Sequence, residues 1–265
     1  LVAEADAAGI DRSRLIIAEN GRTSHTDAFT STRTGRRTHL YLPGTADELT
    51  PDHFDFSQVH ARILHLGLPG VHAKLDAPWG SDANGWVTVL KKAQSAGIAT
   101  NLELCSIPAD RIAEFVRPCL AHLDLLVVND FEIAAIAGLS AGHDTEVDVQ
   151  HCIGAARQVL AAGSMRLVVA HFPHGAVAVS AGGKEVSIPS VAVPLDAIQG
   201  TNGAGDAFAA GLLYGLHEDW NVEAAIKLGH ATAAASVRSL GTTDAVVSWR
   251  ESLELASLWG RRSSF

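Results

Sequence analysis

The chain has 265 residues, of which 47% are hydrophobic, and its formal net charge at pH 7 is −9. That length allows one large α/β core, and the acidic balance argues against a nucleic-acid-binding surface. No apolar run in the sequence reaches membrane-spanning length, and the three cysteines lack metal-ligand spacing, as is typical of buried thiols in a reducing cytoplasm.

The segment 16–43 differs in composition from the rest of the chain. Its threonine-rich stretches at 23–30 and 36–42 flank a short polar linker, which predicts a β-hairpin. Ordinary edge strands are the alternative. We therefore expect a small β-sheet over 16–43, set apart from a core built by 1–15 and 44–265.

From residue 63 onward, short apolar strands alternate with helices. The predicted strands are 63–67, 98–102, 125–128, 167–170 and 176–180, and the predicted helices between them are 83–96, 109–116 and 146–162. Apolar strands separated by helices of this length imply a parallel sheet covered on both faces. The fold class is therefore α/β.

Two candidate motifs follow predicted strands. Asn129 to Glu132 comes directly after the strand 125–128, at the strand end where α/β proteins bind ligands. An asparagine with a glutamate three residues later is also a variant of the capping box, so both interpretations stay open. After the next strand, His171 and His174 are poor candidates for a metal site, because their spacing lacks a helical face and no acid or cysteine pair is near.

The glycine loop Gly200 to Asp206 leads directly into a predicted helix over 206–216. Small residues before a helix let backbone amides converge on an anion, and the helix dipole adds to the attraction. Asp206 stands where a phosphate-binding loop usually has a lysine. A carboxylate would repel a bound phosphate, but it suits a general base that removes a proton from a hydroxyl group attacking phosphorus. The alternative is an ordinary helix start with a dipole-favoured aspartate.

The last predicted helix, in the segment 222–241, carries Ala225, Gly229 and Ala233 at four-residue intervals. This stripe of small residues allows close approach of another helix or of a flat ring, and packing is the default explanation. Gly241 is typical of a residue that ends a helix.

The loop Gly200 to Asp206, with Ala207 and Phe208 after it, resembles the signature of the ribokinase-like, or PfkB, family of carbohydrate kinases. The resemblance implies a ribokinase-like three-layer sandwich with a mainly parallel central sheet and a small β lid formed by 16–43. It also implies that Gly203, Ala204 and Gly205 form an anion hole for the transferring phosphoryl group and that Asp206 is the catalytic base.

Other parts of the chain match the same family. Asn129 to Glu132 is similar to its Asn-x-x-Glu motif, in which the glutamate holds Mg²⁺ through water at the phosphates of ATP. The resemblance further implies nucleotide contacts from Asn129, Gly175, Thr201, His230 and Gly241, and it makes His171 and His174 a wall of the adenine pocket. Gly200 replaces the family's leading aspartate, which helps to hold a monovalent cation, so activation by such a cation is doubtful here.

The resemblance predicts ATP-dependent phosphorylation of a primary hydroxyl group on a sugar or a related small molecule, or on a nucleoside. It implies a cytoplasmic enzyme without nucleic-acid or membrane partners, with a homodimer through the lid as one option. Because the chain begins at Leu1 and matches the later part of the family pattern, we expect the first core strand and the sugar-binding motif to be missing.

Two other functions stay open. A catalytically impaired nucleotide or sugar sensor with the same fold is favoured by Gly200, by Pro173, which stands where the family commonly has a glycine, and by the expected missing front end. A Rossmann-type oxidoreductase is weaker, because its glycine fingerprint and ribose-binding acid are absent from this sequence.

Overall fold

The computed structural model describes residues 2–31, 33, 37–140 and 147–263. Its centre is a six-stranded sheet with the strand order β3-β4-β5-β6-β7-β8. The strands are β3 (Ile63–Leu66), β4 (Ala99–Leu102), β5 (Leu125–Asn129), β6 (Leu167–Phe172), β7 (Gly175–Ser180) and β8 (Glu185–Pro189). The three pairs from β3 to β6 are parallel, and the two remaining pairs are antiparallel.

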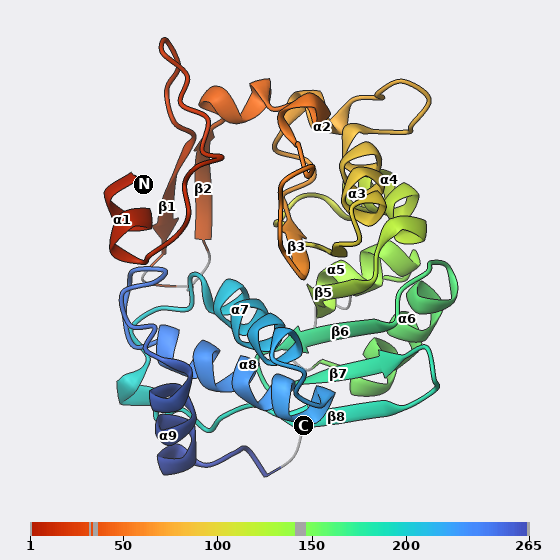
Figure 1. Ribbon diagram of the computed structural model, residues 1–265. Helices are drawn as coiled ribbons and strands as arrows, with labels where there is room; N and C mark the ends of the chain where they lie inside the picture. Colours follow the sequence, from red (N-terminus) through yellow and green to blue (C-terminus); the bar gives the residue numbers. More distant parts are fainter. Residues whose placement is uncertain (1, 32, 34–36, 141–146, 264–265) are drawn as a thin grey trace.

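Helices cover both faces of this sheet, as Figure 1 shows. One face carries α2 (Ala73–Asp76), α3 (Gly85–Ser95), α4 (Ala109–Val116), α5 (Asp130–Ala137) and α6 (Val149–Ala161); the other carries α7 (Ala204–His217) and α8 (Val222–Ser236), with α9 (Trp249–Trp259) against α8. Short elements complete the described chain: α1 (Val2–Ala7) and the 3₁₀ helices η1 (Gly44–Glu48), η2 (Pro51–His53), η3 (Arg117–His122) and η4 (Leu195–Ala197).

Two hydrophobic cores result from the alternation of side chains along the strands. Leu126, Val128 and Val168 point toward α3 to α6, whereas Leu125 and Val127 point toward Phe208 and Ile226 of α7 and α8. Runs of apolar residues are what a strand covered on both sides requires. The predicted three-layer sandwich with a mainly parallel sheet is therefore confirmed.

The antiparallel part of the sheet begins at β7, whose direction was not predicted. Phe172 pairs with Gly175, so only Pro173 and His174 form the turn between β6 and β7. Two residues can join antiparallel strands but cannot make the crossover that a parallel pair needs. The strand β8 and the helix α9 were not predicted, although Ser248 and Glu251 form a capping box at the start of α9.

The strands β1 (His25–Thr30) and β2 (Arg37–Leu42) form a separate antiparallel sheet. Figure 1 shows this sheet standing apart from the central one, beside α1. The Tyr41 hydroxyl donates a hydrogen bond to Val71 O at 2.9 Å, which ties β2 to the segment before α2. Part of the predicted linker lies outside the described residues.

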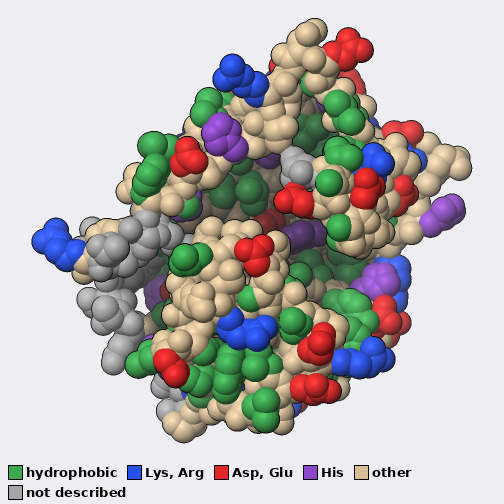
Figure 2. All heavy atoms as spheres, turned by 90° about the vertical axis from the view of Figure 1, so that its left-hand side faces the viewer, with side chains coloured by type: hydrophobic (Ala, Val, Ile, Leu, Met, Phe, Trp, Pro, Cys, Tyr) green, Lys and Arg blue, Asp and Glu red, His purple; other side chains and the backbone are tan. Residues whose placement is uncertain are grey.

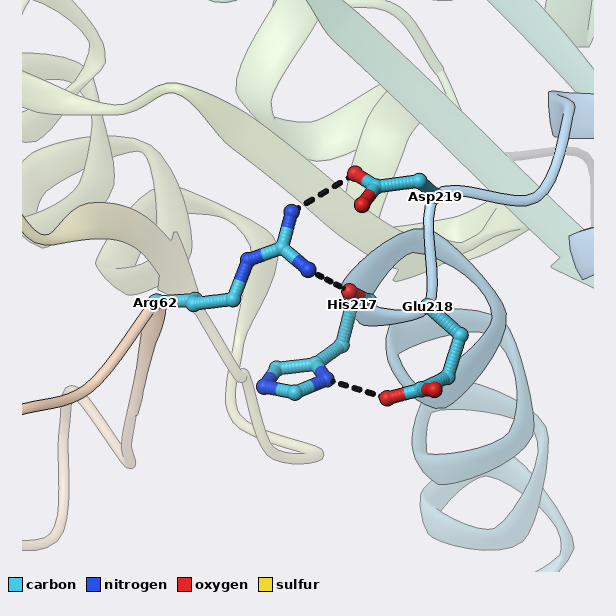
Figure 3. Close-up of polar contacts among 4 residues, drawn as sticks. All are labelled: Arg62, His217, Glu218 and Asp219. Carbon is cyan, nitrogen blue, oxygen red and sulfur yellow. Dashed lines mark hydrogen bonds and ion pairs between the residues drawn. The ribbon is translucent and has the colours of Figure 1, made fainter.

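Arg62, which precedes β3, fixes the C-terminal end of α7 (Figure 3). Its guanidinium donates hydrogen bonds to His217 O and, at 2.6 Å, to Asp219 Oδ1. His217 Nδ1 lies 2.8 Å from Glu218 Oε1. A cation at a helix C-terminus stabilises the last carbonyl groups and the helix dipole. The opposite end of α7 is the end at the glycine loop.

Asn84 joins α3 to α4, and its replacement by alanine should cost about 2–3 kcal/mol in the free energy of unfolding. The side chain is 2% exposed, accepts a hydrogen bond from Val87 N at 3.0 Å and donates one to Phe115 O at 3.0 Å. Asn84→Ala removes the helix cap and the amide donor to Phe115 O, which keeps the weak thiol donor of Cys119 at 3.4 Å. Urea unfolding measures the loss. Asn221→Ala removes an exposed cap of α8, should cost only about 1 kcal/mol, and serves as the control. Equal losses in the two variants would contradict the link to α4.

Candidate active site

The glycine loop ends in a left-handed residue from which α7 starts. Gly203 has φ 77°, and the first helical hydrogen bond runs from Ala207 N to Gly203 O at 2.9 Å. The amides of Gly205 and Asp206 come before that bond and have no acceptor among the residues that the structure describes. Free amides at the positive end of a 14-residue helix are suited to hold an anion.

Asp206 is the third residue of α7, two positions after the observed helix start. Its side chain is exposed and makes no hydrogen bond or ion pair within the described part of the chain. A carboxylate in this position is accessible to a ligand in solution. The arrangement therefore permits the predicted role of Asp206 as a proton acceptor beside the loop amides.

Gly200 packs tightly against the segment that follows α8. Gln199 N and Gly200 N both donate to Val237 O, at 2.9 and 3.2 Å. A Cβ atom on Gly200 would lie 3.0 Å from Ser239 O and 3.3 Å from Leu240 Cα. Gly200, which replaces the aspartate of the family signature, thus lies where two backbone segments approach each other closely.

The same close approach brings two predicted nucleotide-binding residues together. Thr201 is exposed in the glycine loop, and Gly241 lies in the neighbouring segment, where its amide donates to Ser239 Oγ at 3.1 Å. A Cβ atom on Gly203 would lie 2.8 Å from Thr242 O. The glycine loop and the segment around Gly241 consequently form one surface.

Asn129 and Glu132 occupy the end of β5 and the first turn of α5. Asn129 Oδ1 accepts from Glu132 N at 2.8 Å, and Glu132 Oε2 accepts from Asn129 N at 2.9 Å. The capping box, one of the two interpretations left open by the sequence, is therefore present. Glu132 is only 5% exposed, and its burial raises its pKa to about 7; the charges of Glu103 and Asp130 add to the rise, against the opposing hydrogen bond from Asn129.

This raised pKa predicts a pH-dependent effect of Glu132→Gln. Because the folded-state pKa of Glu132 lies near 7 and the ordinary value is 4.5, the wild type loses stability as the pH rises through that interval. The glutamine variant has no proton to lose. Its free energy of unfolding should therefore gain on that of the wild type by about 2–3 kcal/mol between pH 5 and pH 8.

Denaturant unfolding at several pH values tests this prediction. Glu251 occupies the same capping-box position in α9 but is exposed, and the Ser248 hydroxyl lowers its pKa. The folded-state pKa of Glu251 thus lies below its ordinary value of 4.5, and the wild type gains on Glu251→Gln only as the pH rises toward that value. Between pH 5 and pH 8 the difference between Glu251→Gln and the wild type should therefore stay nearly constant. A pH-independent difference between Glu132→Gln and the wild type would show that Glu132 is ionised throughout.

A polar cluster on β3 and β4 was not predicted. Asn101 is fully buried, and its Nδ2 lies 2.7 Å from His65 Nδ1. His65 Nε2 in turn lies 3.0 Å from Glu103 Oε2. Asn101 Oδ1 and Glu103 Oε2 are buried atoms without a hydrogen bond among the described residues. The signal in the sequence was the polar pair Asn101 and Glu103, two positions apart at the end of β4.

The remaining predicted residues lie around β7 and β8. Gly175 starts β7 and pairs with Phe172 and Pro189. His230 is 4% exposed, and its Nε2 lies 3.1 Å from Ile188 O. Burial lowers the pKa of His230 to about 3. His230 is thus packed between α8 and β8, and its predicted contact with adenine stays a prediction.

His171 connects the Asn129 end of β5 with the glycine loop. It pairs with Asn129 across β5 and β6, and a Cβ atom on Gly205 would lie 3.3 Å from His171 Cε1. The structure thus brings Asn129, Glu132, Gly205 and Asp206 to one edge of the sheet. Ligands bind at this edge in α/β proteins.

Figure 2 shows that the molecule is hollowed on the face that carries the small sheet, with histidine and acidic side chains on the walls of the hollow. A separate groove of about 490 Å³ lies between the end of β2, α2 and α4, and Tyr41, Asp76 and Phe115 are among its lining residues. It shares no residue with the glycine loop. Within the described residues no helix has the length and apolar character needed to cross a membrane.

Residues 1–249 match the family described as pfkB family carbohydrate kinase. Among curated proteins, the chain is 30% identical over 159 residues to ribokinase from Bacillus subtilis, covering 57% of this chain and 53% of that protein. It is 28% identical over 165 residues to adenosine kinase from Schizosaccharomyces pombe, which covers 59% of this chain and 47% of that protein. The chain thus spans about half the length of these curated relatives.

Solved structures share the fold. Ribokinase from Thermotoga maritima has a TM-score of 0.73 and 21% identity, over 97% of this chain and 76% of that one. Arabidopsis thaliana ribokinase complexed with ribose and ATP has a TM-score of 0.70 and 17% identity, over 97% and 77%. Burkholderia thailandensis nucleoside kinase in complex with inosine has a TM-score of 0.69 and 14% sequence identity, over 98% of this chain and 78% of that chain. The fold is therefore the ribokinase fold.

Proposed function

We propose, since the chain belongs to the pfkB family of carbohydrate kinases, that it transfers the γ-phosphoryl group of ATP to a primary hydroxyl group of a sugar or a nucleoside. The observation that carries this proposal is the exposed Asp206 carboxylate beside the amides of Gly205 and Asp206 at the start of α7, none of which has a partner among the residues that the structure describes. Ribokinase and adenosine kinase among the relatives support both acceptor classes.

The proposed mechanism relies on position and electrostatics. Asp206 accepts the proton of the attacking hydroxyl group, which makes the oxygen a better nucleophile toward phosphorus. The backbone amides of the predicted anion hole, Gly203, Ala204 and Gly205, hold the phosphoryl oxygens as charge builds up on them. The Ala204 amide must then exchange its long hydrogen bond to Thr201 O, at 3.4 Å, for a phosphoryl oxygen. Thr201 and Gly241 contribute further contacts to the nucleotide from the same surface. No covalent enzyme intermediate is required.

Negative charge near Glu132 supports a divalent cation there, because Glu103 and Asp130 add to the rise that burial causes in the pKa of Glu132. Glu103 Oε2 already lies 3.0 Å from His65 Nε2, and among the described residues no group of three or more His, Cys, Asp or Glu side chains could hold a metal ion directly. Mg²⁺ prefers oxygen ligands and keeps several of its waters. Glu132 would hold Mg²⁺ through water, and the ion would neutralise phosphate charge.

The small sheet β1–β2 suits a lid over the acceptor. It stands apart from the central sheet, and the hydrogen bond from Tyr41 to Val71 ties it to the segment between β3 and α2. A cover of this kind would exclude water from the transferring group. Its exposed apolar side chains Phe29 and Leu40 also suit contact with a second copy of the chain. Use of ATP implies a cytoplasmic enzyme.

A sensor that binds nucleotide or sugar without turnover is the second candidate. The observation in its favour is Gly200, because the close approach of Ser239 and Leu240 leaves little space for the aspartate found in the family. A monovalent cation would then lack one of its ligands. Binding of ATP without phosphoryl transfer distinguishes the sensor from the kinase.

The deciding experiment measures ADP release by the full chain with ATP and Mg²⁺ in the presence of a panel of neutral sugars and nucleosides. The kinase predicts that at least one acceptor accelerates ADP release and gains phosphate. If calorimetry shows that ATP binds, and no acceptor accelerates the release of ADP, the sensor is supported instead.

A further inference from the structure

Asp219 follows the end of α7 in a backbone conformation that usually belongs to glycine. Its φ is 59°, and it is the one residue other than glycine with a positive φ among those that the structure describes. Its amide donates to Leu216 O at 3.2 Å, and the amide of Trp220 donates to Gly215 O at 2.9 Å. These two bonds form a Schellman motif, in which glycine is the usual left-handed residue. A residue with a Cβ atom is less favourable there than glycine.

The Asp219 carboxylate binds Arg62, as Figure 3 shows. Arg62 Nη2 donates to Asp219 Oδ1 at 2.6 Å, and Nη1 donates to the carbonyl oxygen of His217, the last residue of α7. Glycine at position 219 would keep the Schellman motif but would leave Nη2 without this acceptor. The ion pair is exposed, so its direct contribution to the free energy of unfolding is small. Stability alone therefore does not account for an aspartate at this position.

Arg62 connects two elements whose opposite ends form the proposed site. It directly precedes β3, and Ile63 packs against the core beneath α7 and α8. The helix α7 starts at Ala204 beside the glycine loop and has 14 residues, so its end at His217 is about 21 Å from its start. Its backbone hydrogen bonds keep the rise per residue constant, so a shift along the axis at one end appears at the other. Movement near Arg62 would therefore also move Asp206.

The packing of α7 holds it tightly against α8. A Cβ atom on Gly215 would lie 2.9 Å from Ala225 Cα, and one on Gly211 would lie 2.9 Å from Leu228 O. The two helices are thus in backbone contact and move as one unit. Toward the sheet, α7 makes apolar contacts, which have no preferred direction, whereas the two hydrogen bonds of one guanidinium group fix a direction.

We propose that Arg62 and Asp219 are positioning residues, which set the place of α7 along its axis and thereby align Asp206 and the loop amides with the acceptor. This inference rests on the proposed kinase function. Phosphoryl transfer depends on such alignment, because a displacement of about 1 Å can lower a rate by about 100-fold. Both residues act through α7, since they lie at the end of the helix that is remote from the glycine loop.

Asp219→Gly separates positioning from stability. Glycine suits the left-handed conformation, which offsets the loss of an exposed ion pair, so the melting temperature should stay within about 3 °C of the wild type. The kcat of phosphoryl transfer should nevertheless fall by about 5- to 20-fold, with the affinity for ATP within about twofold. Asp219→Asn keeps an oxygen acceptor for Arg62 and tolerates the same backbone conformation, so it should recover most of the lost kcat.

Arg157 supplies the matched control. It is also exposed, and its guanidinium donates two hydrogen bonds to the Glu185 carboxylate, between α6 and β8. Arg157→Met should leave kcat unchanged, whereas Arg62→Met should lose at least as much kcat as Asp219→Gly. Because the two residues act as a unit, adding Asp219→Gly to Arg62→Met should cause no further loss. Unchanged kcat in Asp219→Gly, an equal loss in Arg157→Met, or parallel losses of kcat and melting temperature without recovery in Asp219→Asn would overturn the assignment.

A second measurement needs neither ATP nor an acceptor. The ring of His171, which belongs to β6, lies beside Gly205, since a Cβ atom on Gly205 would lie 3.3 Å from His171 Cε1. An aromatic ring shifts the resonances of nearby nuclei, so the Gly205 amide reports the place of α7 relative to the sheet. In ¹⁵N-labelled protein, Asp219→Gly should shift that resonance, and Arg157→Met should leave it in place.

Failure of the underlying function has its own signature. If the wild type phosphorylates no acceptor, the proposed kinase is wrong, and the Gly205 resonance still decides whether Arg62 and Asp219 set the place of α7. A resonance that stays in place in Asp219→Gly shows that they do not, whatever the activity of the wild type.

Discussion

Asp206→Asn is expected to reduce phosphoryl transfer by about 10²- to 10⁴-fold while leaving the affinity for ATP nearly unchanged. Asparagine has almost the same size as aspartate but cannot accept the proton of the acceptor hydroxyl group. The amides at the start of α7 belong to the backbone, and Asp206 has no partner among the described residues that the change would disturb. The loss should therefore appear in kcat rather than in nucleotide binding.

Steady-state rates with the best acceptor and calorimetry with ATP give the two required values. Asp110 is an exposed aspartate in the first turn of α4, so Asp110→Asn removes the same charge from a comparable helix start. That control should retain full activity. Unchanged turnover in Asp206→Asn would reject the base, and a parallel loss of ATP affinity would assign Asp206 to binding.

Gly203→Ala should lower phosphoryl transfer by about 10²- to 10³-fold, the loss expected when an oxyanion donor is misplaced. Gly203 has φ 77°, a conformation that costs a residue with a Cβ atom about 1–2 kcal/mol. The new Cβ atom would also lie 2.8 Å from Thr242 O, a backbone atom that cannot rotate away. The loop must then shift relative to Thr242 and carry the amides out of place.

Gly183→Ala separates these two causes. Gly183 has φ 79° in the turn between β7 and β8, and a Cβ atom there would meet nothing within 4 Å. It should lose stability from the backbone conformation alone and keep its activity. Thermal unfolding and kinetics on both variants make the comparison. Equal activity in the two variants would show that Gly203 does not position the amides.

Much of the fold could be predicted because its signals are local. The strands β3 to β6 are short apolar runs, and α3 and α4 lie close to their predicted ranges. The direction of β7 was not predicted, because it depends on a two-residue turn, whereas the parallel arrangement was inferred from strands that helices separate. The strand β8 was missed because one of its faces is exposed and carries polar residues, so its sequence has no clear apolar run.

The candidate site also combines residues that the sequence could locate with contacts that it could not. The glycine loop and the capping box of Glu132 are contiguous in the sequence, and both could be located without coordinates. Glu103 was not connected with that site, and His171 was assigned to it only through the family resemblance, as a wall of the adenine pocket. Its position next to Asn129 and Gly205 follows from strand register and from folding. Contacts between segments far apart in the chain carry no local signature.

The close packing around Gly200 has a consequence for engineering this position. A Cβ atom on Gly200 would lie 3.0 Å from Ser239 O and 3.3 Å from Leu240 Cα, so any larger residue requires the turn at Ser239 and Leu240 to move by a few tenths of an ångström. An acidic residue at position 200 is therefore best introduced together with a change in that turn.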